Sequence, residues 1–132
     1  MNEYKRTQTT ISMINYHFVF CPRYRRKIFD DIKVEKRFKE LVYGISKDIN
    51  CEIIAIECHR DHTHIFLSSV PKLSPSDIMA KIKGVSSRII RSEFPYLSTT
   101  SALWTRSFFV STAGNVSSST IKRYVETQKT RG

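Results

Sequence analysis

Glycine, proline and long apolar runs are all scarce in this chain of 132 residues. Glycine and proline occur four times each, against eight phenylalanines and six tyrosines, a composition that excludes a largely disordered chain. No apolar run approaches the ~20 residues that a membrane-spanning helix needs. The opening residues MNEYKRTQTT also lack the apolar segment of a secretory signal peptide. We therefore expect a cytoplasmic protein with no membrane partner.

Cysteine is scarce as well, and its three copies include no C-x-x-C pair. The odd number argues against a disulfide framework, and the spacing argues against a zinc site built on thiolates. The pattern indicates buried free thiols in a reducing compartment at Cys21, Cys51 and Cys58.

Acidic residues are few relative to basic ones: 12 Asp and Glu face 22 Lys and Arg, which leaves a formal net charge of +10. A small domain this basic usually binds a polyanion. Nucleic acid is the favoured partner, and an anionic membrane surface comes second because no long basic amphipathic helix stands out. The length is typical of one domain, so residues 1–132 are predicted to form a single unit with flexible ends at 1–10 and 129–132.

Apolar periodicity predicts four strands and three helices in the order β-α-β-β-α-β-α. This order is that of an α+β, ferredoxin-like βαββαβ antiparallel sheet with an added C-terminal helix. Arg60–Asp61 is predicted to form a hairpin turn, and Ser74 followed by Pro75 marks the start of a helix. The strands are predicted at 11–21, 51–59, 63–70 and 103–112, and the helices at 32–50, 73–94 and 116–128.

Two histidines one residue apart stand out in RDHTHIF, residues 60–66. Alternate residues of a strand point to the same face, so His62 and His64 are expected side by side. Imidazole is the commonest protein ligand of metals, and two on one face can chelate a divalent ion. On this spacing alone, a pair of partly exposed histidines without a function stays open as the alternative.

The last predicted helix carries a second pair, Tyr124 and Gln128, which are four residues apart and share a helical face. The carbonyl oxygen of Gln128 is a hard ligand that suits Mg²⁺ or Mn²⁺. The phenol oxygen of Tyr124 can attack phosphorus, but with an ordinary pKa of ~10 it needs activation. Lys122 and Arg123 would favour the approach of phosphate. A tyrosine merely half-packed on the sheet is the alternative.

Five stretches, in order along the chain, carry a resemblance to a known family: NYHFVFCPRYRRKIF, RDHTHIFLS, IKGVSSRIIRSEFP, LWTRSFFVSTAG and IKRYVETQ. Over nearly its whole length the chain resembles the TnpA-type single-tyrosine HUH transposases of the insertion sequence 200/605 family. The resemblance implies that His62 and His64 are metal ligands, that Gln128 is the third ligand and that Tyr124 is the nucleophile. It also implies that Tyr124 attacks single-stranded DNA, forming a 5′-phosphotyrosine and releasing a 3′-hydroxyl, and that a 3′-hydroxyl later rejoins the strand.

The same resemblance implies partners and a cofactor. Family members bind imperfect hairpins near the ends of the element. They act as homodimers in which the tyrosine helix of one subunit completes the metal site of the other. The expected cofactor is Mg²⁺ or Mn²⁺, and whether Tyr124 acts within its own subunit stays open.

Two positions depart from the family pattern. Thr63 stands between the histidines where a bulky apolar residue is usual, and it should point away from the ligands. Ser107 stands where many relatives have glycine, which affects the local bend. Asp61 is expected either to orient an imidazole or to shape the turn. His17 and His59 are expected to be structural or rim residues, with a supporting role near the site as an alternative for His17.

Two basic clusters are candidates for DNA contact through phosphates, with base stacking where a tyrosine is interleaved. Solvated charge without a ligand is the alternative for both. Trp104 is expected in the core or at a dimer interface. The first cluster comprises Arg23, Tyr24, Arg25, Arg26 and Lys27, and the second comprises Lys81, Lys83, Arg88 and Arg91.

Three other functions remain open from the sequence. A non-catalytic nucleic-acid-binding domain of ferredoxin-like fold explains the charge, but it leaves the histidine pair and the tyrosine–glutamine pair as a coincidence. A metal-dependent endonuclease would use water as the nucleophile. A REP-associated tyrosine transposase would cut hairpins without mobilising its own element.

Overall fold

The structure, a computed structural model, describes residues 13–112, 118–129 and 131. The prediction for the flexible segment 1–10 lies outside the described residues. So do the first two residues of the predicted strand 11–21 and of the predicted helix 116–128.

Four strands form one antiparallel sheet in the order β2-β3-β1-β4. Strand β3 lies between β1 and β2, so the sheet has the strand order expected of a ferredoxin-like fold, and that prediction is confirmed. The two residues between β2 and β3, Arg60 and Asp61, form the predicted turn. The strands are β1 (Ile14–Phe20), β2 (Glu52–His59), β3 (His62–Ser69) and β4 (Phe109–Ser111).

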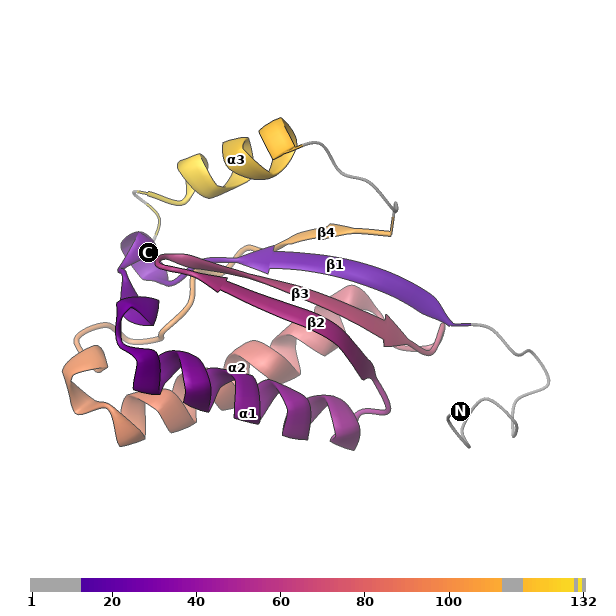
Figure 1. The fold of residues 1–132 in the computed structure, drawn as a ribbon, viewed down its shortest axis with the longest axis horizontal. Coiled ribbons are helices and arrows are strands. Elements are labelled where there is room, and N and C mark those ends of the chain that lie inside the picture. Colours follow the sequence, from indigo (N-terminus) through magenta and orange to yellow (C-terminus); the bar gives the residue numbers. More distant parts are fainter. Residues whose placement is uncertain (1–12, 113–117, 130, 132) are drawn as a thin grey trace.

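The helices cover both faces of this sheet (Figure 1). Helices α1 (Ile32–Asp48) and α2 (Pro75–Glu93) lie together on one face, whereas α3 (Ser118–Thr127) lies on the other. Asp31 caps α1 by accepting a hydrogen bond from Lys33 N, and Ser74 forms a capping box with Asp77 at the start of α2. Short 3-10 turns occupy Arg23–Arg25, Ile28–Asp30 and Pro95–Leu97.

The main core lies between the sheet and the pair α1 and α2. Phe18 and Phe20 of β1 alternate with residues that face α3, as do Ile65 and Leu67 of β3. Thr63 belongs to this buried row, as expected, and its hydroxyl donates to the carbonyl oxygen of Glu57 at 3.3 Å. The helices contribute Val34, Phe38, Val42, Ile78, Met79, Ile82 and Ile90.

The fourth strand is much shorter than predicted. Only residues 109–111 pair with β1, whereas the prediction was 103–112. The ladder ends at the pair Val19 and Phe109, and the next bridge joins Pro22 to Trp104. One side advances three residues between these pairs and the other side advances five, so two extra residues before β4 break the register. Residues 103–105 are nevertheless buried, and Trp104 packs in the core rather than at the surface.

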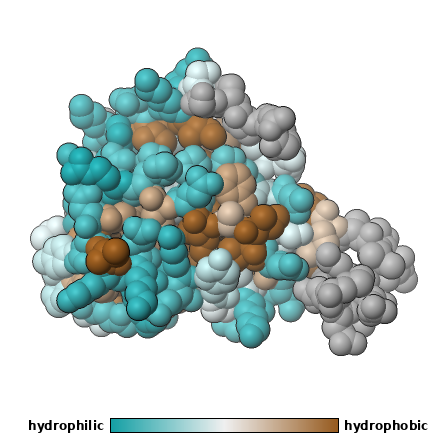
Figure 2. Space-filling view, in the orientation of Figure 1, coloured by the Kyte–Doolittle hydropathy of each residue, from teal (hydrophilic) through white to brown (hydrophobic). Residues whose placement is uncertain are grey.

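The surface is mostly hydrophilic on the face that Figure 2 shows, with separate apolar patches. Single exposed apolar side chains of this kind are normal for a globular protein. Within the described ranges, no helix combines the length and the apolar character needed to cross a membrane. The exposed large apolar residues are Tyr24, Ile32, Tyr43, Ile54 and Tyr96.

Phe38 gives a test of this core. Its ring is fully buried, with ring centroids 5.3 Å from Phe29, 5.4 Å from Trp104 and 6.2 Å from Phe20. Phe38→Ala should lower the free energy of unfolding by ~3–5 kcal/mol, because it leaves a cavity in an aromatic cluster. Urea denaturation followed by circular dichroism measures the change. Tyr43→Ala, at an exposed site of the same helix, should cost no more than ~1 kcal/mol; equal losses for the two variants would contradict this core.

Candidate metal centre and tyrosine helix

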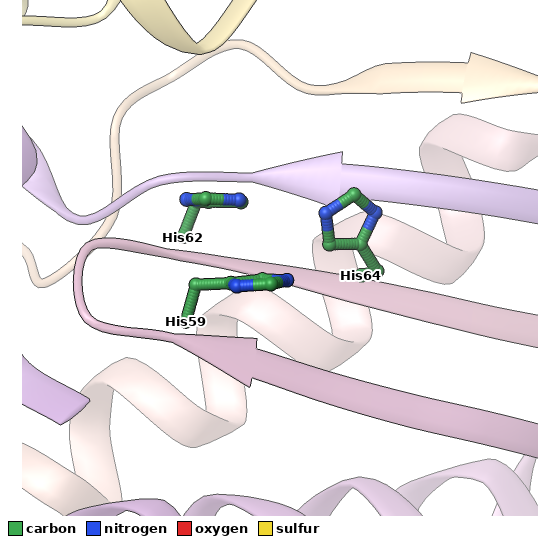
Figure 3. Close-up of side chains that lie close together, drawn as sticks. All are labelled: His59, His62 and His64. Atoms are coloured by element: carbon green, nitrogen blue, oxygen red, sulfur yellow. The ribbon is translucent and has the colours of Figure 1, made fainter. Parts of the chain in front are cut away.

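Three histidines converge on the β2–β3 hairpin (Figure 3). His59 pairs with His62 directly across the turn, and His64 follows on the same face of β3. Their ligand atoms all lie within 4.8 Å of one another. The structure thus places the two predicted ligands together and adds His59, which was predicted to be a structural or rim residue.

Both predicted ligands have one ring nitrogen already engaged. Nδ1 of His62 donates to Oδ1 of Asp61 at 2.9 Å. A hydrogen bond of the same length joins Nδ1 of His64 to Nε2 of His17. Each ring is therefore fixed by a hydrogen bond at its Nδ1, and its Nε2 remains available for a ligand. Asp61 therefore contacts the His62 ring, and His17 contacts the His64 ring.

Asp61 is in turn held by Arg25. The guanidinium lies 2.8 Å from the Asp61 carboxylate, and its other nitrogen lies 3.7 Å from Glu126 of α3. Tyr24 and Arg25 have φ angles of 59° and 50°, a left-handed conformation that is unfavourable for residues other than glycine. The ion pair to Asp61 is one of the contacts that hold Arg25 in this conformation.

Burial sets the protonation of the histidines. Loss of solvent, together with the neighbouring imidazoles His62, His17 and His59, lowers the pKa of His64 to about 4. Burial likewise lowers the pKa of His62, although the hydrogen bond to Asp61 opposes the shift. Burial raises the pKa of Asp61. Hydrogen bonds from His62 and Arg25 outweigh this effect, so the pKa of Asp61 lies below its usual value. Both imidazoles are therefore neutral near pH 7, the form that binds metal.

Helix α3 lies over the face of the sheet that carries the histidines. Val125 of α3 packs on Val19 and Cys21, and Val19 is the cross-strand partner of His64. Residues that pair directly across strands share a face, so α3 and His64 are on the same side. Tyr124 and Gln128 come from this helix and its C-terminal end.

A serine holds both predicted residues of α3. The hydroxyl of Ser107 donates to Oε1 of Gln128 at 3.0 Å, and the Tyr124 hydroxyl lies 3.2 Å from the Ser107 hydroxyl oxygen. Gln128 is buried, and the Tyr124 ring lies 6.0 Å from Phe109 of β4. The Tyr124 hydroxyl thus rests on the 103–108 segment, in a hydrogen-bond network separate from the one that holds the histidines. The Asp61–Arg25–Glu126 contacts join the histidine network to helix α3 at a different residue, Glu126.

The resting phenol of Tyr124 is a weak acid. Burial raises its pKa to about 12, while hydrogen bonds with Ser107 and Thr105 act in the opposite direction. At neutral pH the oxygen carries its proton, so attack on phosphorus needs a change in its surroundings.

A large cavity lies away from the histidines. It has a volume of about 820 Å³ and is bounded by α2 and the segment that precedes β4. Lys83 donates to the carbonyl oxygens of Thr105 and Ser107, and burial lowers the pKa of its ammonium to about 8. Among the described residues, Arg88 makes no hydrogen bond or ion pair. The predicted DNA-contact residues that line this cavity are Arg23, Lys83, Arg88 and Arg91.

The other predicted DNA-contact residues are distributed differently. Arg25 is tied to Asp61, and Arg26 donates to the hydroxyls of Thr99 and Thr100. Tyr24 is exposed, as are Lys122 and Arg123 on α3. Lys27 borders a smaller cavity near Asp30. The first basic cluster therefore does not form one continuous surface.

Comparison with known proteins supplies the family. The model of the IS200-like transposases matches residues 10–128. The chain belongs to the IS200-like transposase family. Its transposase relatives include the ISDra2 transposase TnpA of Deinococcus radiodurans, 26% identical over 96% of this chain and 91% of the relative. The transposase for insertion sequence element IS200 of Salmonella typhimurium is 32% identical over 86% of this chain and 75% of the relative.

Solved structures of other transposases have the same fold. A crystal structure of a protein assigned as a transposase in Deinococcus radiodurans superposes with a TM-score of 0.86 at 26% identity, covering 97% of this chain and 98% of the other. A REP-associated tyrosine transposase bound to a REP hairpin gives a TM-score of 0.55 at 16% identity, over 96% of this chain and 69% of the other. The resemblance found in the sequence is confirmed, and this transposase has the fold of its relatives.

The low pKa of His64 predicts how stability changes with pH in the metal-free transposase. In the unfolded chain histidine takes up a proton near pH 6.5, whereas folded His64 does so only at about 4. The unfolded state therefore binds more protons in this window, and the free energy of unfolding should fall as the pH is lowered from ~6.5 to ~4.

His64→Gln should remove part of that slope, on the order of 1 kcal/mol after allowance for solvent screening at a half-buried site. Urea unfolding in the presence of a chelator, at several pH values, measures both curves. Parallel curves for the two proteins would show that His64 does not carry the effect.

Proposed function

We propose that this transposase cuts and rejoins single-stranded DNA through a covalent phosphotyrosine on Tyr124, with a divalent metal held at the histidine centre. The whole chain, residues 1–132, acts as one domain in this proposal. The observation that carries it is the placement of α3, with its tyrosine, on the face of the sheet to which His62 and His64 belong.

The donor set at the centre fits a divalent cation. His62 and His64 are neutral, are fixed by Asp61 and His17, and have their Nε2 atoms free. Gln128, on the last turn of α3, is the third proposed ligand. Bound Mg²⁺ or Mn²⁺ would withdraw charge from the scissile phosphate and so assist attack by a poorly acidic phenol.

The reaction is a transesterification and needs no water. The Tyr124 oxygen bonds to phosphorus as the bond to the 3′-oxygen breaks, and the phenol proton is lost as the 3′-hydroxyl gains one. In the second step a 3′-hydroxyl attacks the phosphotyrosine, and the Tyr124 oxygen leaves and regains its proton. The covalent intermediate retains the energy of the phosphodiester bond, so ATP is not required.

Tyr124 must leave its resting place for this chemistry. Its hydroxyl is bound to Ser107, and its raised pKa reflects burial there. In the proposal, DNA binding moves the helix over a histidine centre, either in its own subunit or in the partner of a homodimer.

The cavity beside α2 supports binding of folded DNA. Arg23, Arg88 and Arg91 line it, and the net charge of +10 favours a polyanion. We propose hairpins near the element ends as the DNA that this surface binds. The REP-associated transposase, whose fold is similar, has been solved with a hairpin.

Tyr124→Phe tests the nucleophile. Hairpin-bearing single strands labelled at either end are incubated with the protein and Mn²⁺ or Mg²⁺, and products are separated on a denaturing gel. The wild type should give a protein adduct on the fragment 3′ of the cut, and Tyr124→Phe should abolish the adduct while DNA binding persists. Tyr43→Phe, at an exposed tyrosine of α1, serves as the matched control and should behave as the wild type.

The same gel separates the alternatives. Cleavage without an adduct that survives Tyr124→Phe indicates an endonuclease, and a mobility shift without any cutting indicates a simple binding domain. Either result would refute the phosphotyrosine mechanism. A REP-associated activity would give the adduct but no excision of an element flanked by its own ends.

Mixing two inactive variants decides which subunit supplies the tyrosine. His64→Ala removes a proposed ligand, and Tyr124→Phe removes the nucleophile, so each protein alone should be inactive. If α3 acts on the partner subunit, co-expression restores adduct formation, with the DNA attached to the His64→Ala subunit. Size tags on the two chains identify the labelled subunit. A mixture that stays inactive, although the two tagged chains co-purify, would show that the tyrosine acts within its own subunit.

A further inference from the structure

His59 lies where a third imidazole ligand would lie. It is the last residue of β2, immediately before the turn, and it pairs with His62 across the hairpin. Figure 3 shows its ring on the same side of the hairpin as those of His62 and His64. One ring nitrogen from each of the three histidines lies within 4.8 Å of the other two, so the backbone already brings together three donors of one kind.

The His59 ring is free to turn toward an ion. Within the described part of the chain its nitrogens have no hydrogen-bond partner, and the residue is exposed. Its ring now stacks on His62, with centroids 4.5 Å apart and planes 10° from parallel. A nitrogen binds metal in the plane of its ring, so one of the stacked rings must rotate. His59 can rotate without breaking a hydrogen bond, whereas His62 is held by Asp61.

The required movement is small. Two nitrogens bound to one tetrahedral ion at ~2.1 Å are separated by ~3.4 Å. The ligand nitrogens now lie 4.8 Å apart or less, so each pair must approach by about 1.4 Å at most to bind one ion. A side-chain rotation at the end of an exposed strand supplies a shift of this size.

Gln128, by contrast, is already engaged. Its Oε1 accepts from Ser107 at 3.0 Å, its Nε2 contacts the hydroxyl of Thr127 at 3.1 Å, and the side chain is buried. Ligation by Gln128 would break the bond to Ser107 and would depend on the movement of α3. The histidines need no such movement.

We propose that His59 is a direct ligand of the metal, so that the chain holds a three-imidazole site before DNA binds and without Gln128. This inference rests on the metal dependence proposed above. Three imidazoles favour first-row transition ions over Mg²⁺, which prefers oxygen ligands and retains its water. The site should therefore bind Mn²⁺, Co²⁺ and Zn²⁺ in preference to Mg²⁺, with affinity rising in the order Mn²⁺, Co²⁺, Zn²⁺ for most nitrogen sites.

Two variants of His59 separate ligation from packing. His59→Phe keeps an aromatic ring to stack on His62 but has no nitrogen, and His59→Ala removes both. The test measures binding of Co²⁺ alone to the metal-free full chain, by visible absorption and by calorimetry. Both variants should raise the dissociation constant by at least ~10-fold, since even the loss of a residue that only orients a ligand costs that much. Gln128→Ala should leave Co²⁺ binding almost unchanged in the absence of DNA.

Other outcomes are equally informative. Wild-type dissociation constants and absorption bands in both His59 variants would overturn the inference and leave His62 and His64 as the ligands. Loss of binding in His59→Ala but not in His59→Phe would assign a packing role and overturn it too. If the wild type binds no Co²⁺, Mn²⁺ or Zn²⁺ at all, this inference and the proposed metal dependence both fail. Thermal unfolding in the presence of a chelator checks that each variant is folded.

Discussion

The burial of one face of β3 fixes the position of the whole histidine centre. Thr63, Ile65 and Leu67 point into the core between the sheet and the helices α1 and α2. Because side chains alternate along a strand, His62 and His64 must then point to the opposite face. A slip of one residue would bury the histidines and expose the apolar row, which a closely packed core does not permit. The positions of these histidines are therefore fixed as firmly as the register of β3.

The hairpin turn extends this constraint to β2. With two residues in the turn, the residues that flank it pair directly, which places His59 against His62. Arg25 reaches the turn residue Asp61 from a strained loop, and it also approaches Glu126 of α3. The centre is thus tied to the tyrosine helix by charge, while its geometry is set by the sheet. This division agrees with the proposed function, in which Tyr124 moves and the histidines stay in place.

Ser107 gives the resting state of the tyrosine a physical basis. Its hydroxyl binds both the Tyr124 hydroxyl and the side chain of Gln128. The backbone of this segment is fixed by Lys83, whose ammonium donates to the carbonyl oxygens of Thr105 and Ser107. Lys83 also lines the basic cavity. From the sequence, Ser107 was expected to affect only the local bend. In the structure it contacts both Tyr124, the proposed nucleophile, and Gln128, the proposed third ligand.

The sequence by itself determined the order of the elements, the fold class, the start of α2 at Ser74 and the two histidines of one strand face. These follow from local rules: apolar periodicity, turn length and the alternation of a strand. The two-residue turn also implied that His59 pairs with His62. From the sequence, His59 was nevertheless expected to be a structural or rim residue and was not grouped with the other two rings.

Only the tertiary structure decided the length of β4, the contact of His17 with His64 and the resting place of Tyr124. Each depends on residues distant along the chain, such as Pro22 against Trp104 and Ser107 against Gln128, and no local pattern records which distant groups will meet.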